Sequence, residues 1–497
     1  MSFGEDLDKL VAEHSDGLVG AHSSWQRIKL GDVATLVNGF AFKSNHFNDA
    51  VGTPLLRIRD IVRGKVETYY NAPVDDPKMP HVANGEIVVG MDGDFNSRIW
   101  TGGKALVNQR VCTLQADEQF YSQKLLAFAL PAYLNMINDH TSSVTVKHLS
   151  SKTVQDIPLP LPPLNEQQRI VEKIETLFAQ LDKGEEALRE VQKLLTRYRQ
   201  SVLKAAVTGE LTANWRAERA GQLEDGRSLL NSILQNRREK WSGRGKYKEP
   251  KTPSITDLPT LPESWLWTSM DALVIRGPQN GIYLPQEKYG DGTPIIRIDD
   301  FQTGWVRAVK KLRKVTATSE EIETYSLMNG DFVINRVNSV THLGKTMLVG
   351  PEHEGALFES NMMRCSVSPY LDPPYLELYL SSAIGRKRLI KNCKHAVNQA
   401  SINQGDVGTT PVPLPPLDEQ REIAVLAKER LARTDILVEW CEIELKRSGS
   451  LRQSILKDAF AGKLVPQDPS DEPASALLAR IVAQQPTAKN SARRRHA

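Results

Sequence analysis

The 497-residue sequence has few cysteines and no long apolar segment. Its four cysteines, at positions 112, 365, 393 and 441, lie far apart and form no paired-cysteine or Cys/His metal pattern. We therefore expect free thiols, with neither a disulfide framework nor a metal site. No stretch approaches the roughly 18 apolar residues of a membrane span. The acidic start, MSFGEDLDKLVAEHSDG, lacks the apolar segment of a signal peptide, so we expect a cytoplasmic protein.

A strong excess of charge of one sign is also missing, because 63 basic residues face 60 acidic ones. The net charge of +3 therefore does not by itself indicate nucleic-acid binding. The basic residues are clustered, however, at 237–251 (RREKWSGRGKYKEPK), 310–314 (KKLRK) and 385–394 (GRKRLIKNCK). Clusters of this kind can follow a phosphate backbone, although each one alone is also typical of a solvated surface.

A complete catalytic motif is missing as well. Asp372-Pro-Pro-Tyr375 resembles the active-site tetrapeptide of DNA amino-methyltransferases, but the sequence has no glycine-rich cofactor turn after a strand. LGKT at 343–346 resembles the end of a phosphate-binding loop, but Ser339 stands where that loop needs glycine. We predict that Asp372 is a helix N-cap followed by prolines in the first turn. A self-contained DNA adenine methyltransferase that uses Asp372–Tyr375 is the alternative hypothesis.

The sequence contains a long internal repeat. PLPLPPLNEQ at 158–167 returns as PVPLPPLDEQ at 411–420, and SVLKAAVTGEL at 201–211 returns at the same offset as SILKDAFAGKL at 454–464. The preceding segments correspond more loosely: Trp25 matches Trp265, and GTPLLRIRD at 52–60 matches GTPIIRIDD at 292–300. A diverged segment followed by a well-kept one thus occurs twice, which a chance match does not produce.

The diverged segments have short strand-like runs and the kept segments have helical spacing. We predict an α+β fold with two mixed, β-rich domains separated by two long antiparallel coiled-coil helices in a pseudo-twofold repeat. The expected parts are a flexible leader (1–24), domain 1 (25–157), helix segment 1 (158–212), a connector with a central helix (213–264), domain 2 (265–410), helix segment 2 (411–465) and a disordered tail (466–497).

Apolar residues in each kept segment recur at steps of three and four, the spacing with which one long helix packs along another. The predicted packing residues are Ile170, Ile174, Leu177, Leu181, Leu188, Val191, Leu195, Tyr198, Val202, Ile423, Ala427, Leu431, Leu437, Leu445 and Ile455. The second series is looser, and its register drifts. Two unrelated oligomerisation helices are the other interpretation of this pattern.

Two diverged domains, each followed by the proline-rich motif, a long helix and LKAAVTGEL or LKDAFAGKL, resemble the specificity subunit of type I restriction–modification enzymes. The resemblance implies a non-catalytic protein in which each domain recognises one half of an asymmetric, bipartite DNA target. It further implies that the helices set the spacing and bind two methyltransferase subunits, and that motor–nuclease restriction subunits join the complex. No cofactor is expected in this chain; methyl donor, ATP and magnesium are expected on the partner subunits. A coiled-coil scaffold without a role in DNA binding is a third hypothesis.

Double-stranded DNA would meet polar and basic side chains on loops of the two domains. Arginine and asparagine can bind base edges, whereas lysine mostly contacts phosphate. The candidate DNA-binding residues are Lys43, Asn45, Arg98 and Lys104 in domain 1, and Arg336, Asn338, Lys345, Arg386, Lys387 and Arg388 in domain 2. A structural role is an equally good interpretation for any one of them.

Overall fold

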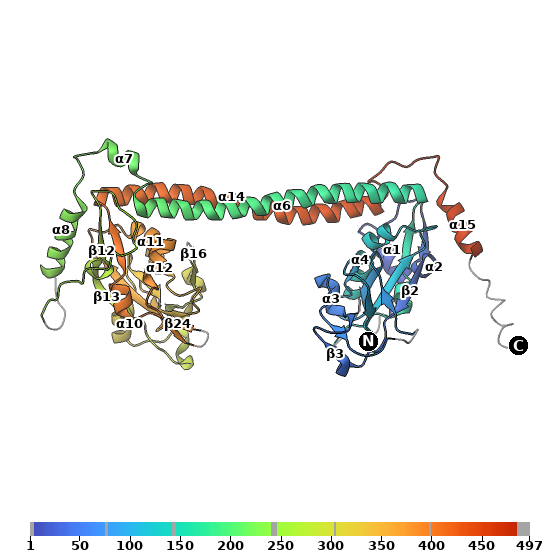
Figure 1. Cartoon of the computed structure of the whole chain (residues 1–497), viewed down its shortest axis with the longest axis horizontal. Helices are drawn as coiled ribbons and strands as arrows, with labels where there is room; N and C mark the ends of the chain where they lie inside the picture. Colours follow the sequence, from blue (N-terminus) through green and yellow to red (C-terminus); the bar gives the residue numbers. More distant parts are fainter. Residues whose placement is uncertain are drawn as a thin grey trace. The chain divides into compact units, whose positions relative to one another are not determined.

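The computed structural model describes residues 4–74, 78–141, 146–239, 246–302, 305–396 and 399–484 (Figure 1). It contains two compact units, Met1–Leu188 with Ile443–Ala497, and Arg189–Glu442. Each unit holds one β-rich domain and part of each of the two long helices. No helix among the described residues is both long enough and apolar enough to cross a membrane.

The domain of the first unit is built around a four-stranded antiparallel sheet and a five-stranded sheet. Their orders are β2-β10-β7-β8 and β3-β5-β4-β9-β6, with β4 and β9 parallel. The strands are β1 Gln26–Lys29, β2 Ala34–Asn38, β3 Phe47–Asn48, β4 Thr53–Leu56, β5 Tyr69–Tyr70, β6 His81–Val82, β7 Ile87–Gly90, β8 Ser97–Ile99, β9 Ala105–Val107, β10 Val111–Ala116 and β11 Pro158–Leu161. The helices are α1 Leu7–Glu13, α2 Leu30–Val33, α3 Ile58–Arg63, α4 Gln123–Asp139, α5 Ser151–Gln155 and α15 Ala474–Gln484.

The domain of the second unit repeats the four-stranded sheet, here in the order β13-β22-β18-β20. Its strands are β12 Leu266–Ser269, β13 Val274–Asn280, β14 Tyr289–Ile296, β15 Phe301–Gln302, β16 Trp305–Val306, β17 Arg313–Val315, β18 Phe332–Asn335, β19 Val337–Asn338, β20 Thr346–Leu348, β21 Leu357–Phe358, β22 Met362–Val367, β23 Lys394–Ala396, β24 Gln399–Ser401 and β25 Pro411–Leu414. Its helices are α7 Ala213–Glu218, α8 Gly226–Glu239, α9 Met270–Leu273, α10 Ser319–Tyr325, α11 Pro373–Ser381, α12 Ala383–Leu389 and α13 Gln404–Gly408.

Both proline-rich motifs form strands that tie a domain to a long helix. β11 pairs antiparallel with β1, and β25 pairs antiparallel with β12. Because each sheet has only two strands, a proline without an N–H is tolerated there. Leu159 and Leu161 are fully buried in the core of the first domain, and Leu414 is fully buried in the core of the second.

The long helices, α6 Leu164–Thr208 and α14 Leu417–Phe460, run antiparallel within each unit. In the first unit Asp182 pairs with Arg452 at 2.7 Å, and Glu185 accepts a hydrogen bond from Ser448 at 2.8 Å. In the second unit Arg199 pairs with Asp435. The residue numbers of the paired side chains therefore increase along α6 while they decrease along α14, as in an antiparallel pair. The predicted α+β fold class and the antiparallel helices are confirmed.

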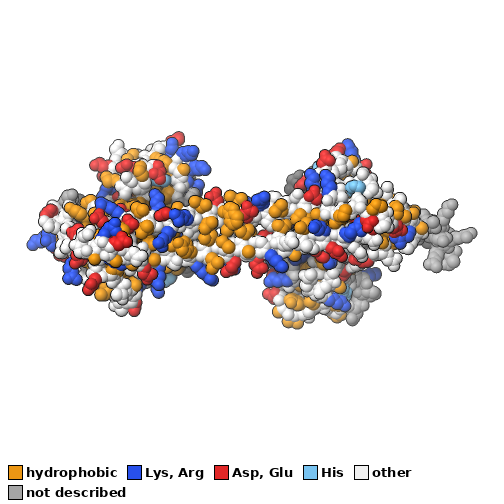
Figure 2. Space-filling view, turned by 90° about the horizontal axis from the view of Figure 1, so that it is seen from above, with side chains coloured by type: hydrophobic (Ala, Val, Ile, Leu, Met, Phe, Trp, Pro, Cys, Tyr) orange, Lys and Arg blue, Asp and Glu red, His pale blue; other side chains and the backbone are white. Residues whose placement is uncertain are grey.

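The predicted packing register is only partly correct. Val191, Tyr198 and Leu437 are exposed, by 40%, 46% and 48%. Thr434 and Cys441 are buried in α14. The prediction followed apolar residue types, but near the middle of the helices polar side chains pair with one another, and several apolar side chains lie on the outer surface (Figure 2).

The other predicted packing residues are all buried or half-buried, which agrees with the prediction. The buried ones are Ile170, Ile174, Val202, Ile423 and Ala427. The half-buried ones are Leu177, Leu181, Leu188, Leu195, Leu431, Leu445 and Ile455.

The predictions for the two ends of the chain are wrong where the structure describes them. The expected flexible leader contains α1, whose Leu10 is buried in the core of the first domain. The expected disordered tail contains α15, whose Leu477 and Ile481 are buried in the same core. Both helices are short and amphipathic, and tertiary packing holds them in place. The rest of the predicted tail, 485–497, lies outside the described residues.

The connector contains the central helix that was predicted, here α8. Its Leu229 and Ile233 are buried in the core of the second domain. α8 and α15 follow α6 and α14 respectively, so each long helix is followed by a short helix that packs on a domain.

Candidate nucleic-acid interface

The glutamate of each repeated motif binds the tryptophan that opens its domain. Trp25 Nε1 donates to Glu166 Oε2 at 3.0 Å, and Trp265 Nε1 donates to Glu419 Oε2 at 2.9 Å. Both carboxylates are buried, and burial raises the pKa of Glu166 above its usual value. The first residues of each domain are thus fixed to the first turn of a long helix.

The glutamine of each motif holds the start of a later helix of the domain in place. The side-chain oxygen of Gln167 accepts from the backbone N–H of Ser122 at 2.8 Å, and that of Gln420 accepts from Asp372 N–H at 2.8 Å. Ser122 and Asp372 are the N-caps of α4 and α11. The Glu-Gln pair therefore orients both the opening and the later helix of each domain.

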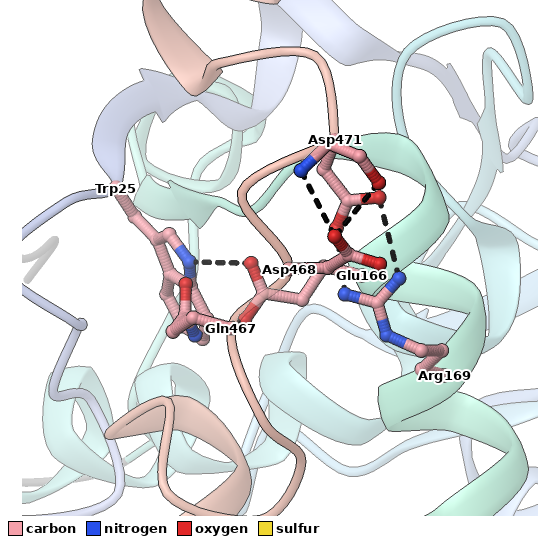
Figure 3. Close-up of polar contacts among 7 residues, drawn as sticks. Trp25, Glu166, Arg169, Gln467, Asp468 and Asp471 are labelled. Carbon is pink, nitrogen blue, oxygen red and sulfur yellow. Dashed lines mark hydrogen bonds and ion pairs between the residues drawn. The ribbon is translucent and has the colours of Figure 1, made fainter.

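The C-terminal segment completes this arrangement in the first unit (Figure 3). Gln467 donates to Glu166, and Arg169 donates twice to the Asp471 carboxylate, at 2.6 and 3.3 Å. These contacts hold the chain that leads into α15. In the second unit Thr212 and Arg216 bond Glu419 in the corresponding place. The internal repeat marks both glutamates in the sequence. The hydrogen bonds that these glutamates accept were not predicted from it.

Three candidate DNA-binding residues of the second domain share one connection, residues 336–345 between β18 and β20. Arg336 is half-buried and donates to the Ser360 carbonyl at 3.2 Å. Asn338 uses its side-chain oxygen to accept from Ser339 N–H at 2.8 Å. Lys345 is half-buried, and burial together with the charge of Arg386 lowers its pKa. The connection thus presents amide, guanidinium and ammonium donors together.

The basic cluster 386–388 lies on α12, and two of its residues have structural contacts. Arg386 donates to the carbonyls of Leu343, at 3.2 Å, and Thr341, so it holds the 336–345 connection in place. Arg388 donates to the Asp257 carbonyl. Lys387 is exposed. The cluster therefore combines support for the connection with an exposed positive charge.

The candidates in the first domain lie on several elements. Lys43 and Asn45 are exposed on the short segment that leads to β3, and Lys104 is exposed immediately before β9. Arg98, on β8, donates to the Ile61 carbonyl at 3.0 Å, at the end of α3. Arg98 therefore has a structural contact, while the other three present polar groups to solvent.

Lys104 and Lys345 each follow a glycine in the sequence, but they are not structural counterparts. Lys345 precedes β20, which pairs antiparallel with β18, whereas Lys104 precedes β9, which pairs parallel with β4. The partner strands show that β20 corresponds to β8 and that β21 corresponds to β9. The Gly-Lys match was local and did not follow strand order.

The Asp372-Pro-Pro-Tyr375 tetrapeptide opens α11, as predicted. Asp372 accepts from Tyr375 N–H at 3.1 Å as the N-cap. The Tyr375 ring is fully buried near Trp265, and its hydroxyl donates to the Pro413 carbonyl at 2.9 Å. A ring in this position cannot stack on an extruded base, so the tetrapeptide lacks the geometry of a methyltransferase site.

Comparison with known proteins agrees with this arrangement. The family model described as "Type I restriction modification DNA specificity domain" matches residues 22–191 and 279–434. The EcoBI specificity subunit of Escherichia coli is 35% identical, over 97% of this chain and 97% of its own. The chain belongs to the family of type I restriction enzyme specificity subunits. The EcoKI specificity subunit of Escherichia coli strain K12 is 26% identical, over 93% of this chain and 95% of its own.

Two solved structures share the fold of this chain. A chain from a structure of complex assembly in the type I R-M system has a TM-score of 0.62 and 17% identity, and the match covers 89% of this chain and 99% of that one. The HsdS subunit from Thermoanaerobacter tengcongensis has a TM-score of 0.50 and 19% identity, with 90% and 100% covered. Within this fold, the Glu-Gln pair that occurs in both copies of the repeat has a structural role that residue type alone did not predict.

Proposed function

We propose that this chain is the DNA-recognition subunit of a type I restriction–modification complex and has no catalytic activity of its own. Each domain would bind one half of a bipartite target. The proposal rests on one observation. Both domains contain the same four-stranded sheet, but the connection between two equivalent strands of that sheet differs. Residues 91–96 join β7 to β8, whereas the longer connection 336–345 joins β18 to β20. Different connections on equivalent frameworks favour two different half-sites.

The chemistry of the 336–345 connection suits contact with a groove of duplex DNA. Arginine and asparagine can bind guanine and adenine edges through two hydrogen bonds each, which is the usual basis of direct base recognition. Arg336 and Asn338 are half-buried, so their positions are more restricted than those of fully exposed side chains. Lys345, Lys387, Lys43 and Lys104 would contact phosphates. Binding should therefore weaken steeply as salt concentration rises.

The long helices would set the distance between half-sites and bind the partner subunits. α6 and α14 are about 45 residues each, so they are roughly 65 Å long at 1.5 Å per residue. The proposed partners are two methyltransferase subunits, which would carry the methyl donor, and motor–nuclease subunits, which would carry ATP and magnesium. The buried Tyr375 supports placing methyl transfer on a partner, because it leaves the alternative site within this chain without an accessible aromatic ring.

Methylation assays on defined combinations of subunits test this proposal. The chain alone, the methyltransferase subunit alone and the two together are each incubated with plasmid DNA and methyl donor, and modified adenines are mapped by long-read sequencing. Only the combination should methylate, at a target with two different halves and a fixed gap. Methylation by the chain alone, or a target with no gap, would contradict the proposal.

A further inference from the structure

A cavity in the second domain is lined by basic and hydroxyl side chains. Its volume is about 320 Å³, and its walls come from the connector, from the end of α12 and from α13 with the residues that follow it. The basic side chains are Lys251, Arg388 and Lys391, and the hydroxyl side chains are Thr252, Ser254 and Thr409. We call this cavity the basic pocket. Lysine, arginine, serine and threonine are the side chains that most often bind phosphate oxygens of DNA.

The basic pocket joins two basic clusters that are far apart in the sequence. Lys251 ends the cluster 237–251, whereas Arg388 and Lys391 belong to the cluster 385–394. Either cluster alone is typical of a solvated surface. Here, however, three cations from two segments line one cavity, and a cavity lined by charge of one sign concentrates ions of the opposite sign. The arrangement therefore favours an anion as the ligand.

The contacts of the lining residues leave most of this positive charge in place. Arg388 donates to the Asp257 carbonyl, which carries no formal charge and so does not neutralise the guanidinium. Asp406 is the acidic residue of the lining, and its carboxylate accepts from Asn403 N–H at 2.8 Å in the cap of α13. Three basic side chains and one acidic side chain give the described lining a formal charge of +2.

The first domain has a cavity at the equivalent place, with the opposite charge. α5 is the counterpart of α13 at the repeat offset, so Thr153 and Asp156 correspond to Asp406 and Thr409. This cavity of about 470 Å³ is lined by Glu5, Asp6, Asp8 and Asp156 together with Lys29 and Lys152. We call it the acidic pocket, because four acidic and two basic side chains give it a formal charge of −2. Positive charge at this place is thus a property of the second domain and not of the shared framework.

The basic pocket lies beside the 336–345 connection, which holds the candidate base-reading residues. Leu389 lines the pocket and also packs against Gly344 of the connection, where an added Cβ would lie 3.4 Å from Leu389 Cδ2. Arg386, one turn earlier on α12, donates to the Leu343 carbonyl of the same connection. A duplex whose base edges meet this connection therefore brings its backbone close to the pocket.

We propose that the basic pocket binds one phosphate group of the DNA backbone at the half-site of the second domain. The first domain makes no such contact through its acidic pocket. This inference rests on the proposed function and adds to it a site that raises affinity without reading bases, because phosphate contacts position a protein on DNA but carry no direct sequence information.

The lining favours a backbone phosphate over the phosphate of a free nucleotide. No aromatic side chain belongs to the described lining of the basic pocket, so a free base would have no ring on which to stack. A backbone phosphate needs no such ring, because the neighbouring connection holds the rest of the DNA.

Binding of duplex DNA by the chain assembled with the methyltransferase subunit tests the proposal. The duplex carries the target mapped by methylation, and fluorescence anisotropy gives its Kd over a series of salt concentrations. Lys251→Gln with Lys391→Gln should reduce the slope of log Kd against log salt by about 0.9, the value for one phosphate, and should weaken binding about eightfold at 0.1 M salt. The methylated sequence should stay the same. Both lysines are exposed, so the fold should tolerate the change, and an unchanged thermal midpoint checks this.

Two matched pairs of substitutions serve as controls. Lys251→Arg with Lys391→Arg keeps both charges and should bind DNA like the wild type. Lys29→Gln with Lys152→Gln removes the same charge from the acidic pocket and should change neither Kd nor the slope.

Duplexes with one neutral methylphosphonate at successive backbone positions locate the phosphate. One position at one half-site should weaken binding by the wild type but not by Lys251→Gln with Lys391→Gln. An unchanged Kd and slope in that variant, or the lack of any such position, would overturn the inference while the proposed function stands. A thermal midpoint that rises with inorganic phosphate or ATP through these two lysines, without an effect on DNA affinity, would assign the pocket to a free phosphate and also overturn it. No binding of the target duplex by the wild-type complex would contradict the proposed function itself.

Discussion

Replacing Tyr375 with phenylalanine tests whether the tetrapeptide Asp372–Tyr375 has a structural or a catalytic role. The change removes only the hydroxyl, which donates to the Pro413 carbonyl at 2.9 Å inside the second domain. The ring keeps its place beside Trp265, because the two ring centroids are 6.5 Å apart and the tyrosine is fully buried. A buried carbonyl that loses its partner costs about 1–3 kcal/mol of unfolding free energy. In a unit of this size each kcal/mol lowers the thermal midpoint by about 2–4 °C.

Scanning calorimetry of the wild type and Tyr375→Phe measures this cost, with Tyr370→Phe, a change at an exposed tyrosine, as the control. Asp372→Ser adds a second arm, because serine caps a helix about as well as aspartate but has no carboxylate. Both variants should support full methylation by the assembled complex at temperatures where they are folded. Loss of methylation in Asp372→Ser, together with wild-type stability in Tyr375→Phe, would refute the structural role.

Three further predictions follow from other contacts. Glu419→Ala leaves a partly buried arginine without its carboxylate and should cost about 3–5 kcal/mol by urea unfolding, whereas the exposed neighbour Asp418→Ala should change little; equal effects would contradict the fixing role. Arg169 holds the pKa of Asp471 below its usual value, so the stability from this pair is present above about pH 4 and is lost as pH falls through the lowered pKa. The difference in urea midpoint between wild type and Arg169→Gln should therefore shrink below pH 4, and a constant difference would count against it. Arg336→Ala should relax base preference in one half-site only, as mapped by sequencing of methylated DNA; an unchanged target would remove this residue from base recognition.

The repeat made most of the architecture predictable from sequence. The proline-rich motif has no helical alternative, and the apolar spacing after it continues for many turns, so both long helices could be placed. The strand-like runs GTPLLRIRD and GTPIIRIDD contain β4 and part of β14. Where apolar spacing and burial coincide, as at Ile170 and Ile423, the packing residues could be predicted too.

Features that depend on tertiary pairing could not be predicted in this way. Leu437 looked like a seam residue, but it is 48% exposed because the partner helix fixes the register. α15 is held by Leu477 and Ile481, and two apolar residues four apart do not distinguish a docked helix from a solvated tail. The Gly-Lys pairs matched in sequence, yet their following strands join different neighbours. Strand order and register arise from contacts between segments far apart in the chain.

Exchange of one domain tests whether each domain recognises one half of the DNA target. Residues 25–157 are replaced by the corresponding segment of a relative, the chimaera is expressed with the methyltransferase subunit, and modified adenines are mapped across the host genome. One half of the modified sequence should change, while the other half and the gap stay as in the wild type. An unchanged target, or a change in both halves, would contradict recognition of one half-site by each domain.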